Sequence, residues 1–149
     1  MPDSGAALNV EHCCCFEDLR LGDTARIERL VDDALIRQFT ALSGDDNPVH
    51  LDEEYARKTR FGGRIAQGML GATFISAVIG SHLPGHGTIY LSQTLKFLSP
   101  VKIGDRVTTE ATVTELRPEK SRAVLKTVCR VGDRVTIEGE ALVMVPKRA

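Results

Sequence analysis

The eight residues from Ser43 to His50 (Ser-Gly-Asp-Asp-Asn-Pro-Val-His) carry the densest set of proton-transfer groups in the chain. They include the carboxylates of Asp45 and Asp46 and the imidazole of His50. Carboxylates and imidazoles are common general acids and bases in proteins. We therefore expect one carboxylate and His50 to face a water molecule or a substrate, with the rest of the chain holding them in place.

A turn at Asn47-Pro48 would bring Asp45 and His50 toward each other. Proline fixes its own φ and disfavours helical backbone at the residue before it, and Asn-Pro is a turn signal. Such a turn would expose both side chains at a loop tip, where a rigid scaffold often presents catalytic residues. Composition alone favours an ordinary solvated turn, with Asp52 capping the helix that follows, and that alternative stays open at this point.

The residues of the same stretch do not match the spacing of known calcium- or zinc-binding motifs. A calcium-binding EF-hand loop starting at Asp45 needs an oxygen ligand at its fifth position and glycine at its sixth, where this chain has Val49 and His50. For zinc, His50 lacks a nearby His or Cys at ligand spacing. We expect no metal site.

The composition indicates an ordinary globular protein. The chain has 149 residues, 42% hydrophobic and 26% charged, enough for one domain with a sizeable core. We expect a leader at residues 1–15 and a single domain at residues 16–149. The net charge of −1 gives no indication of a nucleic-acid partner, and no apolar run is long enough to cross a membrane.

The cysteines indicate a reducing compartment. Three are consecutive at residues 13–15 and the fourth is Cys129, so they form neither a CxxC pair nor a disulfide framework. The N-terminus also lacks the pattern of a secretory signal. We therefore expect reduced thiols and a cytoplasmic protein.

Two elements are expected to lead into the Ser43–His50 stretch. Residues 24–31 alternate loosely between apolar and polar side chains, which predicts a strand. An amphipathic helix follows, capped by Asp32 or Asp33 and ended by Gly44. The acid–base stretch would therefore leave the C-terminus of this helix.

Residues 68–81 (Gly-Met-Leu-Gly-Ala-Thr-Phe-Ile-Ser-Ala-Val-Ile-Gly-Ser) contain no charge and are apolar on nearly every side of a helix. A helix that is hydrophobic all round is buried rather than half-exposed. This one would be about 21 Å long, too short to span a membrane. We expect the rest of the chain to wrap it.

Beyond residue 88 the apolar residues recur with a period of two, as in strands. Strands are expected at about residues 89–97, 107–116, 122–131 and 135–145, which with the early strand make an antiparallel sheet of about five. Such a sheet around one buried helix is a two-layer α+β arrangement and indicates the hot-dog architecture. Its open edges favour pairing with a second copy, so we expect a homodimer.

The start of the expected helix at Gly68 offers a second chemical feature. The first N–H groups of a helix have no partner inside it, and the helix dipole makes that end electropositive. Glycine lets a ligand oxygen approach its N–H closely, which suits a developing oxyanion. The alternative is that Gly68 only caps or packs the helix. Together with the acid–base stretch, an oxyanion site fits proton transfer or water addition beside a carbonyl group.

Residues 43–52 contain an Asp-x-Asn-Pro-x-His motif, and residues 65–70 (Ile-Ala-Gln-Gly-Met-Leu) run into the expected helix. With residues 83–91 and 97–105, these segments resemble the (R)-specific enoyl-CoA hydratases of the MaoC-like, hot-dog group. The resemblance covers about residues 16–146. Gln67 departs from the pattern, because close relatives often have histidine there.

The resemblance implies a role for each matching residue. Asp45 and His50 would bind and activate a water molecule, Gly68 would donate its N–H to the thioester carbonyl, and Asn47 would support the turn. Asp46 stands at a position that varies. The acyl pocket of relatives falls on Ser76, Ile79 and Leu142. Four basic side chains are candidates for the phosphates of coenzyme A, or equally for a solvated surface: Arg60, Arg64, Lys96 and Lys102.

The activity implied by the resemblance is hydration of a trans-2-enoyl-CoA to an (R)-3-hydroxyacyl-CoA, linking fatty-acid oxidation to uses such as polyester synthesis. Coenzyme A would be part of the substrate, and no metal or redox cofactor is expected. The nearest alternative is a 3-hydroxyacyl-[acyl carrier protein] dehydratase. A non-catalytic acyl-CoA-binding module is a further alternative, against which the intact Asp45 and His50 argue. A thioesterase of this fold would carry a carboxylate on the central helix, and residues 68–81 have none.

Overall fold

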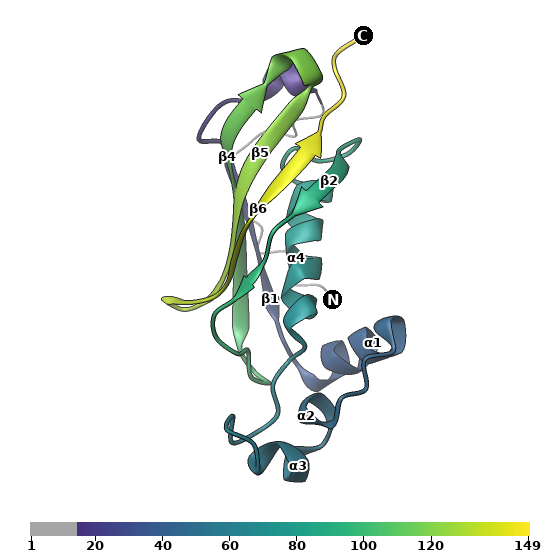
Figure 1. The fold of residues 1–149 in the computed structure, drawn as a ribbon, viewed down its shortest axis with the longest axis vertical. Helices are drawn as coiled ribbons and strands as arrows, with labels where there is room; N and C mark the ends of the chain where they lie inside the picture. Colours follow the sequence, from purple (N-terminus) through teal and green to yellow (C-terminus); the bar gives the residue numbers. More distant parts are fainter. Residues whose placement is uncertain (1–14) are drawn as a thin grey trace.

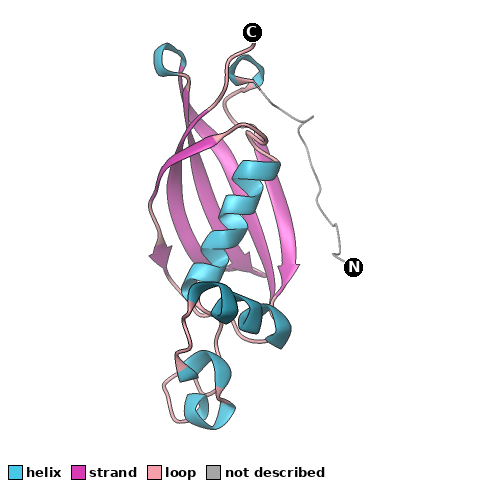
Figure 2. Cartoon of the chain, turned by 90° about the vertical axis from the view of Figure 1, so that its right-hand side faces the viewer, coloured by secondary structure: helices cyan, strands magenta, loops and turns pink. Residues whose placement is uncertain are grey.

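The computed structural model describes residues 15–149, so the expected leader, except for Cys15, lies outside the described residues. One curved sheet packs against one long helix, α4 (Gly68–Ser81), and three shorter helices gather beyond the N-terminal end of α4 (Figures 1 and 2). This arrangement confirms the expected α+β fold, a sheet around a central helix.

The sheet is antiparallel, with strand order β1-β4-β5-β6-β2, and the short β3 also pairs with β6. Its strands are β1 (Thr24–Leu30), β2 (Ile89–Gln93), β3 (Lys96–Phe97), β4 (Arg106–Arg117), β5 (Arg122–Val131) and β6 (Arg134–Met144). The five expected strands are confirmed, with one difference: the run expected at residues 89–97 is split into β2 and β3.

A close backbone contact lies at this split. The carbonyl oxygen of Thr94 lies only 1.8 Å from where a Cβ on Gly139 would be. Thr94 also donates its N–H to the carbonyl of Glu140 at 2.9 Å, and its hydroxyl accepts the N–H of Glu140 at 2.9 Å. Because only glycine leaves room for this approach, Gly139 lets the chain between β2 and β3 come close to β6.

The helices leading to the acid–base stretch begin and end where their capping residues predict. Helix α1 (Asp33–Ser43) has Asp32 as its N-cap, whose carboxylate accepts the Leu35 N–H at 2.9 Å. It ends at Gly44, which has a left-handed φ of 81° that suits glycine. Helix α2 (Pro48–Leu51) and helix α3 (Glu53–Arg57) follow, the latter capped by Asp52 as expected. Two 3₁₀ turns, η1 (Phe16–Asp18) and η2 (Pro118–Lys120), complete the helical elements.

Helix α4 has the expected bounds and the sheet curls around it, but the helix is not buried on every side, although its apolar sequence predicts that it is. Its buried side chains are Leu70, Phe74, Ile75, Val78 and Ile79, which belong to the hydrophobic core with residues of the sheet. The opposite side, which includes Met69, Ser76 and Gly80, is exposed. The sheet curls around one side of the helix, so a single chain leaves the other side open (Figure 2). No helix among residues 15–149 is long and apolar enough to cross a membrane.

Candidate active site

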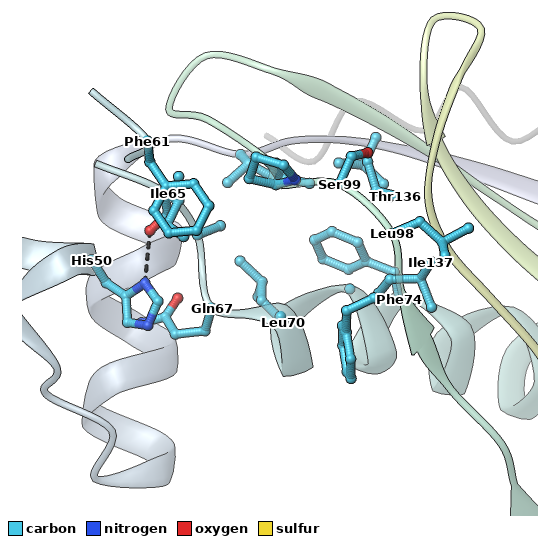
Figure 3. A pocket seen from close by; sticks show the side chains of 18 of the residues that line it. His50, Phe61, Ile65, Gln67, Leu70, Phe74, Leu98, Ser99, Thr136 and Ile137 are labelled. Atoms are coloured by element: carbon cyan, nitrogen blue, oxygen red, sulfur yellow. Dashed lines mark hydrogen bonds between the residues drawn. The ribbon is translucent and has the colours of Figure 1, made fainter. Parts of the chain in front are cut away.

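His50 lies in a short helix that Asn47 starts. The Asn47 side chain accepts the N–H of Val49 at 3.3 Å, and Pro48 takes the first helical position, where its missing N–H is not needed. Figure 3 shows the hydrogen bond between the Nδ1 of His50 and the carbonyl of Ile65, 2.8 Å long. His50 is only 8% exposed. It is therefore not at an exposed loop tip, because α2 turns its ring inward.

The hydrogen bond to Ile65 fixes the tautomer of His50. A carbonyl oxygen can only accept, so Nδ1 carries the hydrogen, and in the neutral ring Nε2 is left as an acceptor. The Asp45 Oδ2 lies 3.9 Å from that Nε2. This distance is too long for a direct hydrogen bond, and one water molecule can hydrogen-bond to both atoms.

The two adjacent aspartates have different surroundings. Asp45 is held by its neighbours: its N–H donates to the Ser43 hydroxyl at 3.0 Å, and its Oδ1 accepts the Asn47 N–H at 3.2 Å. Its other oxygen, on a side chain that is 42% exposed, is the one nearest His50. Asp46 is exposed and makes no side-chain hydrogen bond or ion pair within the described part of the chain. The chain therefore brings Asp45, and not Asp46, to His50.

Arg64 links the acid–base stretch to α1. Its Nε donates to the carbonyl of His50 at 2.7 Å, and its Nη2 donates to Asp33 at 2.6 Å. The hydrogen bond from Arg64, followed by that from Arg37, holds the pKa of the Asp33 carboxyl below its usual value. The stability that the Arg64–Asp33 interaction contributes is therefore fully present above the ordinary pKa of an aspartate. It is lost only as pH falls through the lowered pKa of Asp33. Arg64 is engaged within the fold, which leaves it a poor candidate for the phosphates of coenzyme A.

A cavity of about 250 Å³ lies beside His50 and the start of α4. Its polar end includes His50, Gln67 and Gly68, and Arg60 and Phe61 also line it. Its apolar side chains include Leu70, Phe74, Val107 and Ile137, and Figure 3 shows several of them facing the hollow. The cavity therefore combines a titratable end with a dry lining suited to a hydrocarbon chain.

The N-terminus of α4 is open toward this cavity. Gln67 is the N-cap residue, but its side chain makes no capping hydrogen bond, and no hydrogen bond within residues 15–149 uses the Gly68 N–H. A Cβ on Gly68 would lie 2.9 Å from the Phe97 ring. Glycine thus lets this ring pack directly on the helix start, and the Gly68 N–H stays available to an acceptor in the cavity.

The three residues predicted for the acyl pocket lie outside this cavity. Ser76 is exposed on α4, Ile79 is buried in the core, and Leu142 is partly buried on β6. Their role stays a prediction. Sequence patterns did not single out the side chains that line the apolar part of the cavity, because residues such as Val107 and Ile137 look like ordinary core positions of strands.

The comparisons with known proteins identify the family of this chain. The family model described as "MaoC like domain" matches residues 22–136. An (R)-specific enoyl-CoA hydratase of Rhodospirillum rubrum is 52% identical over 133 residues, 89% of this chain and 92% of that protein. A 3-hydroxybutyryl-CoA dehydratase of Methylorubrum extorquens is 49% identical, covering 89% of this chain and 85% of that protein. The solved structure of the unliganded R-hydratase PhaJ1 from Pseudomonas aeruginosa is similar with a TM-score of 0.87 at 42% identity, covering 91% of this chain and 88% of that one. This chain therefore belongs to the MaoC-like dehydratase family and has its hot-dog fold.

Proposed function

We propose that this protein is an (R)-specific enoyl-CoA hydratase, which adds water across the C2=C3 bond of a trans-2-enoyl-CoA. The observation that carries the proposal is the 3.9 Å separation of Asp45 Oδ2 and His50 Nε2. The proposal is supported by the cavity beside His50, whose lining also includes Gly68 at the open start of α4. The names of the curated relatives support the CoA thioester and the (R) configuration.

The proposed step uses each part of this site. The thioester carbonyl accepts the Gly68 N–H, and a water molecule lies between Asp45 and His50. As the water oxygen bonds to C3, the pair takes one of its protons, and the π electrons move through C2 to the thioester oxygen as an enolate. The helix N-terminus stabilises that negative charge. The enolate then takes the proton back at C2, so that one water molecule is added and the pair is restored.

The experiment that tests this function is hydration of crotonyl-CoA by the purified protein. The rate is measured from the loss of enoyl-thioester absorbance. The same acyl group on an acyl carrier protein tests the alternative carrier. We expect the CoA thioester to be the better substrate by kcat/KM. Turnover of the carrier-protein thioester alone would favour the dehydratase alternative, and no turnover of either would contradict the proposal.

The Gly68→Ala variant is expected to raise KM and to lower kcat by about tenfold, less than removal of an acid–base residue. The backbone N–H remains, but the added methyl group meets the Phe97 ring at 2.9 Å. That exposed ring must move, and it lines the cavity where the thioester would lie. Loss of one oxyanion donor typically costs about 10²–10³-fold in kcat, so a hindered donor should cost less. Steady-state kinetics of Gly68→Ala and of Phe97→Leu separate the two contributions, and unchanged kinetics for Gly68→Ala would argue against the oxyanion role.

A homodimer is part of the proposal. Strand β2 is an edge of the sheet, and its apolar residues Ile89, Tyr90 and Leu91 are exposed, Ile89 by 52%. An apolar edge strand next to the open side of α4 is an expected site for pairing with a second copy. This covering would also explain why α4 carries no charged residue on the side that its own sheet leaves open.

The Ile89→Glu variant is expected to shift the protein from dimer to monomer at micromolar concentration. A buried, unpaired carboxylate at an apolar interface is costly, while on a free edge it would be solvated. Analytical ultracentrifugation measures the change. Leu42→Glu, at an exposed position on α1, is the matched control and should stay dimeric. A monomeric wild-type protein would rule out the dimer.

A further inference from the structure

Gln67 has a buried amide oxygen with no partner. The residue is only 3% exposed, and it lines the same cavity as His50 and Gly68. Among the described residues, no group donates a hydrogen bond to its Oε1. Because buried acceptors are normally paired, this oxygen points to a donor that enters with the reactants.

The orientation of the amide is fixed by its other end. The Gln67 Nε2 donates to the carbonyl of Ile36 at 3.2 Å and to the Thr40 hydroxyl at 3.0 Å. A carbonyl oxygen can only accept, so the NH₂ group must face α1 and the oxygen must face away from it. Figure 3 shows the Gln67 side chain and the His50 ring at the same end of the cavity.

We propose that the Gln67 Oε1 accepts a hydrogen bond from the water that adds to C3, and from the 3-hydroxyl group of the product. This inference rests on the proposed hydratase function. Water loses one hydrogen as a proton to the Asp45–His50 pair, while its second hydrogen stays on the oxygen and becomes the hydroxyl hydrogen. Asp45 Oδ2 and the neutral His50 Nε2 are both acceptors, so they share the first hydrogen in a three-centre hydrogen bond, and Gln67 Oε1 accepts the second. Its hydrogen bond orients the water, so that an oxygen lone pair is directed at C3.

The contacts distinguish this role from a purely structural one. Gln67 precedes α4 but does not cap it with its side chain, and its NH₂ group alone makes both contacts with α1. The oxygen adds nothing to these packing contacts. A substitution that removes the oxygen should therefore affect the reacting water more than the binding of an acyl-CoA that has no oxygen at C3.

The test compares Gln67→Met with Gln67→His. Methionine has a similar length but provides no acceptor of comparable strength and no NH₂ donor, whereas histidine can donate one ring N–H to Ile36 and keep the other nitrogen as an acceptor. Two quantities are measured: kcat for hydration of crotonyl-CoA, and the inhibition constant of butyryl-CoA, which is saturated at C2 and C3 and cannot be hydrated. Thr40→Val is the control for the α1 contact, because it removes one partner of the NH₂ group and leaves the oxygen in place.

We expect Gln67→Met to lower kcat by about 10- to 100-fold while the butyryl-CoA inhibition constant stays within about twofold. Gln67→His should restore kcat to within about fivefold of wild type, and Thr40→Val should stay within about threefold. An active wild type whose Gln67→Met variant keeps full kcat overturns the inference, as does a parallel loss of kcat and butyryl-CoA binding that histidine does not rescue. A wild type that fails to hydrate crotonyl-CoA overturns the proposed function itself, which makes the two failures distinguishable.

Discussion

The His50→Gln variant is expected to lose about 10³-fold in kcat for hydration of crotonyl-CoA while staying folded. A positioned acid–base group typically contributes roughly 10²–10⁴-fold. The ring Nε2 lies 3.9 Å from Asp45 Oδ2 and is the acceptor left by the bond from Nδ1 to Ile65. Glutamine can still donate an N–H to that carbonyl, so the local anchor survives, but glutamine cannot take up a proton. Steady-state kinetics measures the loss, and an unfolding curve checks the fold.

The two neighbouring aspartates provide the matched pair for this prediction. Asp45→Asn should lose activity on the same scale as His50→Gln, because the amide keeps the shape but cannot accept a proton. Asp46→Asn should stay within about twofold of wild type, since Asp46 is exposed and lacks the approach to His50. Near-wild-type activity in His50→Gln, or a larger loss in Asp46→Asn than in Asp45→Asn, would contradict the assigned pair.

The second large effect is expected in the sheet, from Gly139→Ala. The new Cβ would lie 1.8 Å from the Thr94 carbonyl oxygen and 2.8 Å from its carbon. The clashing atoms belong to the backbone of Thr94, so no rotation of a side chain relieves the clash, and the N–H and hydroxyl of Thr94 hold this residue to Glu140. We expect a loss of about 3 kcal/mol in the free energy of unfolding, at the upper end for overpacking, measured by urea denaturation.

Gly22→Ala is the control for the conformational cost of replacing a glycine. Gly22 has a φ of 87°, and a Cβ there would meet nothing within 4 Å. This variant should therefore lose only about 1 kcal/mol, the usual strain of a left-handed residue with a side chain. Equal losses at the two positions would mean that the approach of Thr94 to Gly139 is not what requires glycine.

Local patterns predicted the elements that hold the site because their signals lie next to them in the chain. Asp32 and Gly44 give the two ends of α1, and the uncharged run from Gly68 to Ser81 coincides with α4. The alternation of apolar and polar residues predicted the strands of the sheet. The Asn47-Pro48 pair correctly indicated a change of direction that brings Asp45 toward His50, which the 3.9 Å separation shows.

The remaining features depend on contacts between distant residues, which local patterns do not contain. The burial of His50 follows from its bond to Ile65 and from Arg64 binding its carbonyl. The split between β2 and β3 comes with the approach of Thr94 to Gly139. The exposed side of α4 was not predicted, because an apolar sequence shows that a surface should be covered but does not show which chain covers it.

In the proposed reaction, one acid–base pair both takes the proton from water and returns a proton to C2. Apart from His50, the only side chain in the cavity lining with an ionisable group is Arg60, and arginine is not among the usual general acids and bases of proteins. Both new bonds should therefore form on the same face of the double bond. The direct measurement is hydration of crotonyl-CoA in D₂O, with analysis of the configuration at C2 and C3 of the product. We predict a (3R)-hydroxyl group with deuterium added to C2 from the same face, and a (3S) product or addition from opposite faces would contradict the account.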